Sequence, residues 1–179
     1  MRLACLLADG FEDIEALGTS ALLRRAGFEV DFFSVYNTKK VVGYFKTTVT
    51  KLNYLRNLDI DDYDGIFLPG GKAALTLREN EFVKKIVKQF HVNNKWMLAI
   101  CAAPTVFGLM GLMDGVQYTS YPGTEKDMGK AIRVETKAIS DKKFITGKSA
   151  GSIYDFVFEV IRTVNGEESL KQFKKNIDF

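Results

Sequence analysis

The residue with the clearest chemical potential is Cys101, in the stretch Ala-Ile-Cys-Ala-Ala-Pro at residues 99–104. An apolar run leads into it and small residues follow, which predicts a strand, a sharp turn and then a helix. At a helix N-terminus, free N–H groups and the helix dipole stabilise a thiolate. The N–H of Ala102 would then point at a developing oxyanion, as in a nucleophile elbow. These six residues alone fit an inert buried cysteine about equally well.

Two other features lie near predicted strand ends. Pro-Gly-Gly at residues 69–71 follows an apolar run, and glycine there leaves the N–H of Gly71 uncovered. That N–H could complete an oxyanion hole with Ala102, although a simple turn also explains the glycines. Glu15 falls one turn into a predicted helix, where it can point back over the strand ends. Taken alone, it is better explained as a solvated side chain.

The elements that must position these residues alternate along the chain. Alternating strands and helices predict a mostly parallel sheet covered on both faces, with ligands bound beyond the carboxyl ends of its strands. Residues 9–10, 70–71 and 101 all fall at such ends, so the site is expected there. Strands are predicted at 3–8, 28–35, 65–68 and 96–100, and helices at about 12–25, 82–90, 102–113 and 153–164. A short β excursion is predicted at 41–52, and a polar hairpin region at 116–145.

Length and composition set further bounds. The 179 residues, 46% hydrophobic and 26% charged, predict a single domain spanning 1–179. The net charge of +3 comes from scattered lysines without a recognisable reading element, which argues against nucleic-acid binding. No window is long enough for a membrane span, and the N-terminal apolar stretch is too short for a signal peptide. Cys5 and Cys101 lie far apart, which favours a reducing, cytoplasmic location. No motif for zinc, calcium or nucleotide is complete, so neither metal nor cofactor is predicted.

Four motifs in order carry a family resemblance. They are DGFEDIE at 9–15, LRRAG at 23–27, DYDGIFLPGG at 62–71 and AICAAP at 99–104. Together they closely resemble the ThiJ/PfpI superfamily, in the branch of the Parkinson-disease protein deglycase and its bacterial relatives. The resemblance runs in register to the helix predicted near Ser152. It implies a flavodoxin-like three-layer α/β/α sandwich with a mostly parallel central sheet and a peripheral β-hairpin, usually assembled as a homodimer.

The resemblance also assigns roles to the residues above. It implies that Cys101 is the nucleophile, that Glu15 hydrogen-bonds its sulfur, and that Gly71 and Ala102 supply the backbone donors. Two anions in contact would repel each other, which raises both pKa values. We therefore expect a protonated Glu15 that donates to a Cys101 thiolate, with one proton shared by the pair.

The sequence departs from the family pattern at several positions. Many relatives carry a His-Pro pair on the later hairpin, and here it reads Tyr121-Pro122. Tyr121 either replaces the histidine as a proton donor or lines the pocket; a phenol, protonated at neutral pH, would be a poor base. The only histidine, His91, matches no catalytic position of the family. Lys72 stands where an asparagine usually follows the two glycines, and it is, with Tyr121, a possible pocket residue. Lys148 stands where arginine is common.

Three functions are compatible with these residues. The resemblance implies a cofactor-independent stress-response enzyme of the glyoxalase III or protein deglycase type, acting on a small carbonyl compound or a glycated protein. Methylglyoxal would become a 2-hydroxy acid. The alternative is a non-catalytic redox sensor or chaperone-like protein that uses an oxidisable Cys101. A cysteine hydrolase or amidotransferase is less favoured, because both need a histidine base and none follows Cys101.

Overall fold

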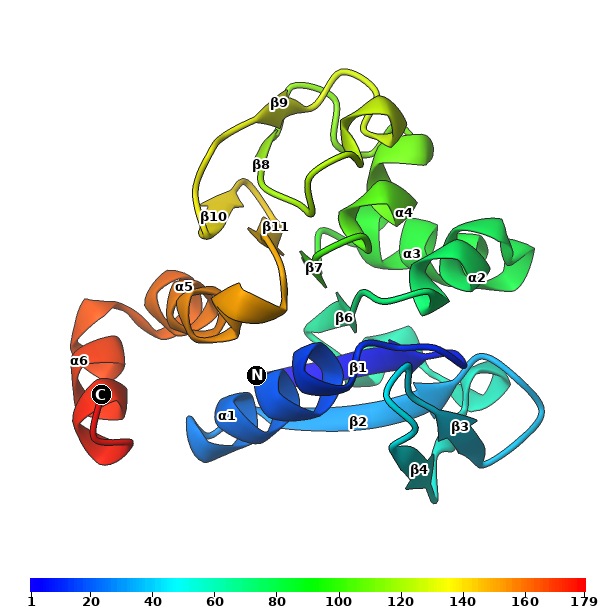
Figure 1. Ribbon diagram of the computed structural model, residues 1–179, viewed down its shortest axis with the longest axis horizontal. Helices are drawn as coiled ribbons and strands as arrows, with labels where there is room; N and C mark the ends of the chain where they lie inside the picture. Colours follow the sequence, from blue (N-terminus) through cyan, green and yellow to red (C-terminus); the bar gives the residue numbers. More distant parts are fainter.

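A seven-stranded sheet forms the centre of the protein in its computed structural model, which describes residues 1–179. Its strands lie in the order β10-β11-β7-β6-β1-β2-β5 (Figure 1). Every neighbouring pair is parallel except β10 and β11, which are antiparallel. The sheet is therefore mostly parallel, as predicted. The strands are β1 (Arg2–Leu7), β2 (Glu29–Ser34), β5 (Asn53–Tyr54), β6 (Gly65–Leu68), β7 (Trp96–Ile100), β10 (Ala138–Asp141) and β11 (Phe144–Gly147).

Helices cover both faces of this sheet and complete the predicted three-layer sandwich. The connection from β1 to β2 moves along the sheet in one direction, and that from β6 to β7 moves in the other. Because such crossovers are right-handed, α1 and α3 lie on opposite faces. α5 packs on α1, β10 and β11, whereas α2 contacts α3 and α4. The helices are α1 (Thr19–Arg25), α2 (Ala73–Glu79), α3 (Glu81–Val92), α4 (Pro104–Leu109), α5 (Ile153–Asn165) and α6 (Glu167–Asn176).

The predicted strands at 3–8, 28–35, 65–68 and 96–100 are confirmed as β1, β2, β6 and β7, each within one residue at either end. The β excursion at 41–52 is confirmed as an antiparallel hairpin of β3 (Lys40–Val42) and β4 (Thr48–Thr50), separate from the central sheet. It lies at the lower right of Figure 1, and a hydrogen bond from the Gly10 N–H to the Val42 carbonyl at 2.8 Å joins it to the loop after β1. This is the peripheral β-hairpin that the family resemblance implied.

The helix predicted at 102–113 was too long. α4 ends at Leu109, whose side chain is 55% exposed, because Gly111 adopts a left-handed φ of 68°. The N–H of Leu112 then donates to the carbonyl of Phe107 at 3.1 Å, which closes a glycine-terminated helix end. The apolar run at 102–113 predicts a buried helix over its whole length, but Gly111 within that run marks the end of the helix.

The region 116–145 is not one hairpin. β8 (Gln117–Tyr118) pairs in parallel with β9 (Ile132–Arg133) as a separate two-stranded sheet, whereas the β10–β11 hairpin joins the edge of the central sheet. α6 was not predicted at all. No helix of the structure has the length and apolar character needed to cross a membrane.

Candidate active site

Cys101 occupies a strained turn directly after β7. Its φ is 65°, a left-handed conformation that a residue with a Cβ adopts at a cost of about 1–3 kcal/mol. Two backbone hydrogen bonds hold the turn: Cys101 donates to the Gly147 carbonyl at 2.9 Å and accepts from the N–H of Tyr121 at 2.8 Å. The side chain stays partly exposed, in contrast to the fully buried Cys5. The turn therefore presents this thiol at the carboxyl end of the sheet, where the sequence predicted it.

Glu15 approaches Cys101 from the segment that follows β1. Residues Ile14–Gly18 form a turn of π-helix ahead of α1, in which the N–H of Thr19 reaches back to the carbonyl of Ile14. This wider turn buries the Glu15 side chain completely. Its Oε2 accepts a hydrogen bond from the N–H of Gly70 at 3.0 Å, whereas Oε1 has no well-formed hydrogen bond. Wide turns of this kind are common at functional sites.

Because Gly70 has no side chain, the side chains of Glu15 and Cys101 can approach each other beside it. A Cβ at this position would lie 2.6 Å from Glu15 Oε2, 2.7 Å from Cys101 Cβ and 3.1 Å from Cys101 Sγ. The carboxyl group and the sulfur therefore converge on the space that a side chain at residue 70 would fill. This arrangement brings together two residues that are 86 positions apart in the sequence.

We expect the substitution Gly70→Ala to destabilise the protein, because the added methyl group must displace both Glu15 and Cys101. Overpacking of this kind costs roughly 1–3 kcal/mol, which lowers Tm by roughly 3–10 °C in a chain of this size. Calorimetry measures the shift. Gly151→Ala is the matched control, since a Cβ there meets only Ser149 Oγ at 3.9 Å. Equal Tm values for the two variants would contradict the close approach at Gly70.

Burial governs the ionisation of the pair. It raises the pKa of Glu15 to about 7, against the lowering effect of hydrogen bonds from Cys101 and Gly70. It also raises the pKa of Cys101 to about 12, with the Glu15 carboxylate as the next cause, whereas the N–H groups of Gly71 and Ala102 lower it. Because each group contributes to the pKa shift of the other, the two titrate as a coupled pair.

The expectation of a helix-stabilised thiolate is therefore corrected in part. Cys101 is not the first residue of a helix: α4 begins at Pro104 with Ala103 as its N-cap, and it has only six residues. The N–H groups of Gly71 and Ala102, the predicted backbone donors, do act on the thiol. Their lowering effect on the thiol pKa is outweighed by burial, which the sequence pattern alone did not reveal.

The structure requires a glycine at position 71. Its φ is 81°, and a Cβ would lie 2.5 Å from both the Glu12 nitrogen and the Gly10 oxygen. The close contact arises because the β1 loop pairs with this glycine through an isolated bridge from Phe11. The loop after β1 can therefore pack against this strand end only where residue 71 has no side chain.

Two adjoining depressions open onto Cys101, with volumes of about 490 and 450 Å³. Both are also lined by Gly71, Lys72 and Tyr121, so the two residues predicted as possible pocket residues do reach the site. Tyr44, from the tip of the β3–β4 hairpin, lines both as well, and residues 149–151 line the larger one. Neither contribution was predicted. The hairpin was recognised in the sequence, but nothing in the pattern showed where its tip would lie.

Other candidate residues lie elsewhere. The ring of His91 packs against Phe144 with centroids 5.8 Å apart, and Lys148 forms an ion pair with Glu135 at 3.0 Å. Neither residue lines the depressions at Cys101. No three His, Cys, Asp or Glu side chains are grouped so that they could hold a metal ion.

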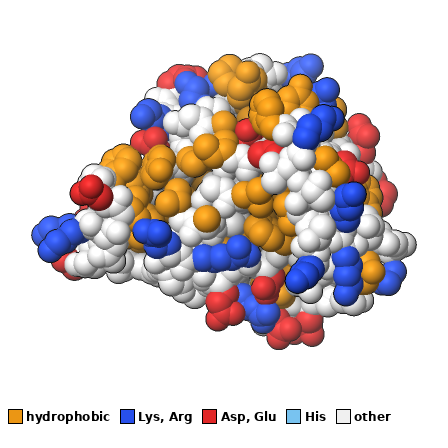
Figure 2. Space-filling model, turned by 60° about the horizontal axis from the view of Figure 1, so that its bottom comes forward, with side chains coloured by type: hydrophobic (Ala, Val, Ile, Leu, Met, Phe, Trp, Pro, Cys, Tyr) orange, Lys and Arg blue, Asp and Glu red, His pale blue; other side chains and the backbone are white.

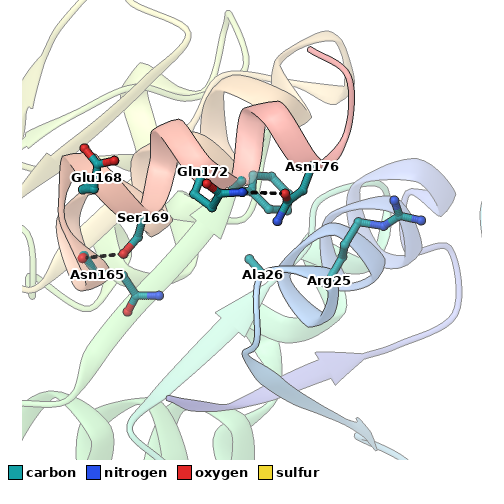
Figure 3. Close-up of a pocket in the computed structure, with 8 residues that line it drawn as sticks. Arg25, Ala26, Asn165, Glu168, Ser169, Gln172 and Asn176 are labelled. Atoms are coloured by element: carbon teal, nitrogen blue, oxygen red, sulfur yellow. Dashed lines mark hydrogen bonds between the residues drawn. The ribbon is translucent and has the colours of Figure 1, made fainter.

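A further groove of about 450 Å³ lies between the end of α1 and α6 (Figure 3). Three of its polar side chains form hydrogen bonds within the groove: Gln172 Nε2 donates to Asn176 Oδ1 at 2.8 Å, and Ser169 Oγ donates to the main-chain carbonyl of Asn165 at 2.9 Å. No cysteine or histidine lines it, so it offers no nucleophile. The chemistry of the molecule is concentrated at Cys101.

Comparisons with known proteins agree with this site and fold. Residues 1–163 match the model of the DJ-1/PfpI family. A deglycase of Pyrococcus abyssi is 29% identical over 164 residues, 90% of this chain and 98% of the relative. DJ-1beta of Drosophila melanogaster is 26% identical over 175 residues, 96% of this chain and 94% of the relative. The structure of oxidised Toxoplasma gondii DJ-1 superimposes with a TM-score of 0.92 at 26% identity, covering 99% of this chain and 98% of that one. A family match over most of the length, on the fold and the motifs described above, shows that the chain belongs to the DJ-1/PfpI family, in its deglycase and DJ-1 branch.

Proposed function

We propose that the protein is a cysteine-dependent enzyme that acts on reactive carbonyl compounds, of the glyoxalase III or protein deglycase type. The observation that supports it most strongly is the convergence of Cys101 Sγ and Glu15 Oε2 on the space beside Gly70, at the floor of an open cavity. Relatives named as deglycases add support. The substrate would be a small 2-oxoaldehyde such as methylglyoxal, or its early adduct on a protein.

In the reactive state we assign the shared proton to Glu15 and the negative charge to the sulfur of Cys101, the reverse of the order in which burial raises their two pKa values. Glu15 is fully buried and Cys101 is partly exposed, so the charge is better solvated on sulfur. An ionised Glu15 would leave the buried Oε1 without a good donor, whereas a protonated Oε1 can donate to the sulfur. The N–H groups of Gly71 and Ala102 stabilise the thiolate.

The reaction follows from that protonation state. The thiolate attacks the aldehyde carbon, the C=O bond opens to an oxyanion that Gly71 and Ala102 hold, and Glu15 protonates it to a hemithioacetal. Glu15, now a carboxylate, removes the proton on this carbon to give an enediolate and returns it to the adjacent carbon. The hydroxyl proton of the hemithioacetal passes to the oxygen on that adjacent carbon as the thioester C=O forms, which leaves a 2-hydroxy thioester. Water hydrolyses the thioester, releasing the 2-hydroxy acid and regenerating the shared proton and the thiolate. Tyr121 lines the cavity as a hydroxyl donor and takes no part as a base.

Formation of lactate from methylglyoxal tests this function directly. The purified protein is incubated with methylglyoxal, and D- and L-lactate are separated and quantified. Absence of both products would exclude the glyoxalase reaction. A Cys-His hydrolase is not supported, because the only histidine lies outside the cavity.

A redox sensor is a second candidate, favoured by the different exposure of the two thiols. Burial raises the pKa of Cys5 far above its usual range, whereas Cys101 opens to a cavity. We expect mild peroxide to convert Cys101 to sulfenic and then sulfinic acid before Cys5 reacts. Peptide mass spectrometry measures both sites. Preferential oxidation of Cys5 would rule out the sensor function.

We also propose a homodimer in the cytoplasm. Large hydrophobic side chains are exposed at Ile14, Tyr154 and Phe179. Figure 2, in which the bottom of Figure 1 is turned toward the reader, shows hydrophobic side chains on the surface of that face. Covering such surface is a common reason for self-association. Both cysteines are free, as a reducing compartment favours. Sedimentation equilibrium is expected to give twice the chain mass of 20.1 kDa, and a monomer at micromolar concentration would contradict the dimer.

A further inference from the structure

Lys72 lies at the candidate active site, but the proposed reaction gives it no role. It follows Gly71 directly and lines both depressions that open onto Cys101. Its Nζ lies 5.0 Å from the centre of the Tyr44 ring. It takes part in none of the ion pairs of the molecule. An ammonium group held over an aromatic face, without a carboxylate partner, remains available to an anion.

Tyr44 is itself fixed, so it can position the lysine. The N–H of Tyr44 donates to the carbonyl of Phe11 at 2.8 Å. The next residue along the hairpin tip is held by Asp13, whose carboxylate accepts from the N–H of Phe45 at 2.9 Å and from that of Thr47 at 3.1 Å. The hairpin tip is thereby tied to the segment that carries Glu15. The Tyr44 ring forms a wall of the cavity and a support for Lys72.

The other charged side chains of the cavity wall have hydrogen-bond or ion-pair partners, although the carboxylate of Glu12 keeps its charge. Arg78 forms an ion pair with Asp127 at 2.9 Å. The Oε2 atom of Glu12 accepts from the N–H of Glu15 at 2.7 Å, which turns that carboxylate toward the backbone. Lys72 is therefore the cation of the cavity wall that has no acidic partner. Methylglyoxal has no charge for it to bind.

We propose that Lys72 is a substrate-positioning residue that binds an anionic group, so that the site prefers carbonyl compounds that also carry a carboxylate. The reactive carbonyl would face Cys101 while the carboxylate pairs with the ammonium group on the same cavity wall. A 2-oxoaldehyde with a carboxylate a few bonds away, such as 4,5-dioxopentanoate, fits this description. The chemistry at the carbonyl rests on the proposed function, but the anion site does not.

A pair of matched alkylating reagents tests the anion site without any turnover. Iodoacetate and iodoacetamide both form a bond between the Cys101 sulfur and their CH₂ carbon with loss of iodide, and they differ mainly in charge. The ratio of their rates cancels any change in the thiolate fraction. We expect Lys72→Met to lower the iodoacetate-to-iodoacetamide ratio about fivefold, and Lys72→Arg to retain it. Peptide mass spectrometry assigns the label, since Cys5 is buried.

An unchanged ratio in Lys72→Met would overturn the proposal. So would a loss in Lys72→Arg as large as in Lys72→Met, because the effect would then depend on shape and not on charge. As a further check, added salt should lower the wild-type ratio toward that of Lys72→Met, since exposed charges are screened.

Turnover then separates this inference from the proposed function. The substrates are 4,5-dioxopentanoate and its uncharged methyl ester, and the quantity is the ratio of their kcat/KM values. We expect wild type to favour the acid and Lys72→Met to lose about fivefold of that preference. Equal use of acid and ester by wild type would overturn the inference while leaving the proposed function standing. A Lys72-dependent alkylation ratio without turnover of either compound would support the anion site and reject the carbonyl enzyme.

Discussion

Replacing Cys101 with alanine is expected to abolish the formation of lactate from methylglyoxal, with kcat/KM reduced by at least about a thousandfold. The reason is that the covalent hemithioacetal cannot form without the sulfur. Glu15 and the N–H groups of Gly71 and Ala102 would remain, but no nucleophile would be left between them. The measurement is the rate of lactate formation at saturating and limiting methylglyoxal.

Cys5→Ala is the matched control, because it makes the same chemical change at the other thiol. Cys5 is fully buried in β1, so this variant should lose stability but keep its activity. Cys101→Ala should fold, since alanine carries the same Cβ as cysteine into the turn with φ of 65°. Circular dichroism verifies the fold of both variants. Full turnover by Cys101→Ala would refute the thiol mechanism.

The position of the site was predictable from topology. Carboxyl ends of parallel strands meet at one edge of a sheet, so the loops after β1 and β6 and the turn after β7 had to converge. The strand bounds were read correctly because buried strands are short apolar runs that end at glycine or proline, as at Pro69. Only the family resemblance pointed to Glu15 as a site residue, because the neighbouring residues alone favour a solvated side chain.

The remaining features depend on contacts between distant segments. A regular helical pattern does not reveal the π-turn that buries Glu15. The hairpin tip that carries Tyr44 is held by Phe11 and Asp13, some 30 residues earlier in the chain. Burial raises the pKa of Cys101 against the lowering effect of the Gly71 and Ala102 N–H groups, and the degree of burial depends on the whole fold. Local patterns thus predicted which elements form, but not how loops between them enclose the site.

Replacing Glu15 with leucine is expected to raise the pKa of the Cys101 thiol and to slow its alkylation at neutral pH by about tenfold or more. In the wild type burial raises the pKa of Glu15 to about 7, and Glu15 and Cys101 titrate as a pair. If the remaining proton rests on Glu15, the thiolate forms at that pH. Leucine supplies no proton and keeps the sulfur buried, so the ascending limb of the rate against pH moves above the usual thiol range.

Two measurements show whether the thiol pKa of Cys101 rises or falls in Glu15→Leu. The rate of alkylation by iodoacetamide and the ultraviolet absorbance of the thiolate are each followed against pH in wild type, Glu15→Leu and Glu15→Gln. Glutamine keeps a hydrogen-bond donor but has no charge, so its thiol pKa should fall between the other two. A thiol pKa lower in Glu15→Leu than in wild type would mean that Glu15 acts as a carboxylate that repels the thiolate. In that case the proton rests on Cys101, and the proposed route through a preformed thiolate is wrong.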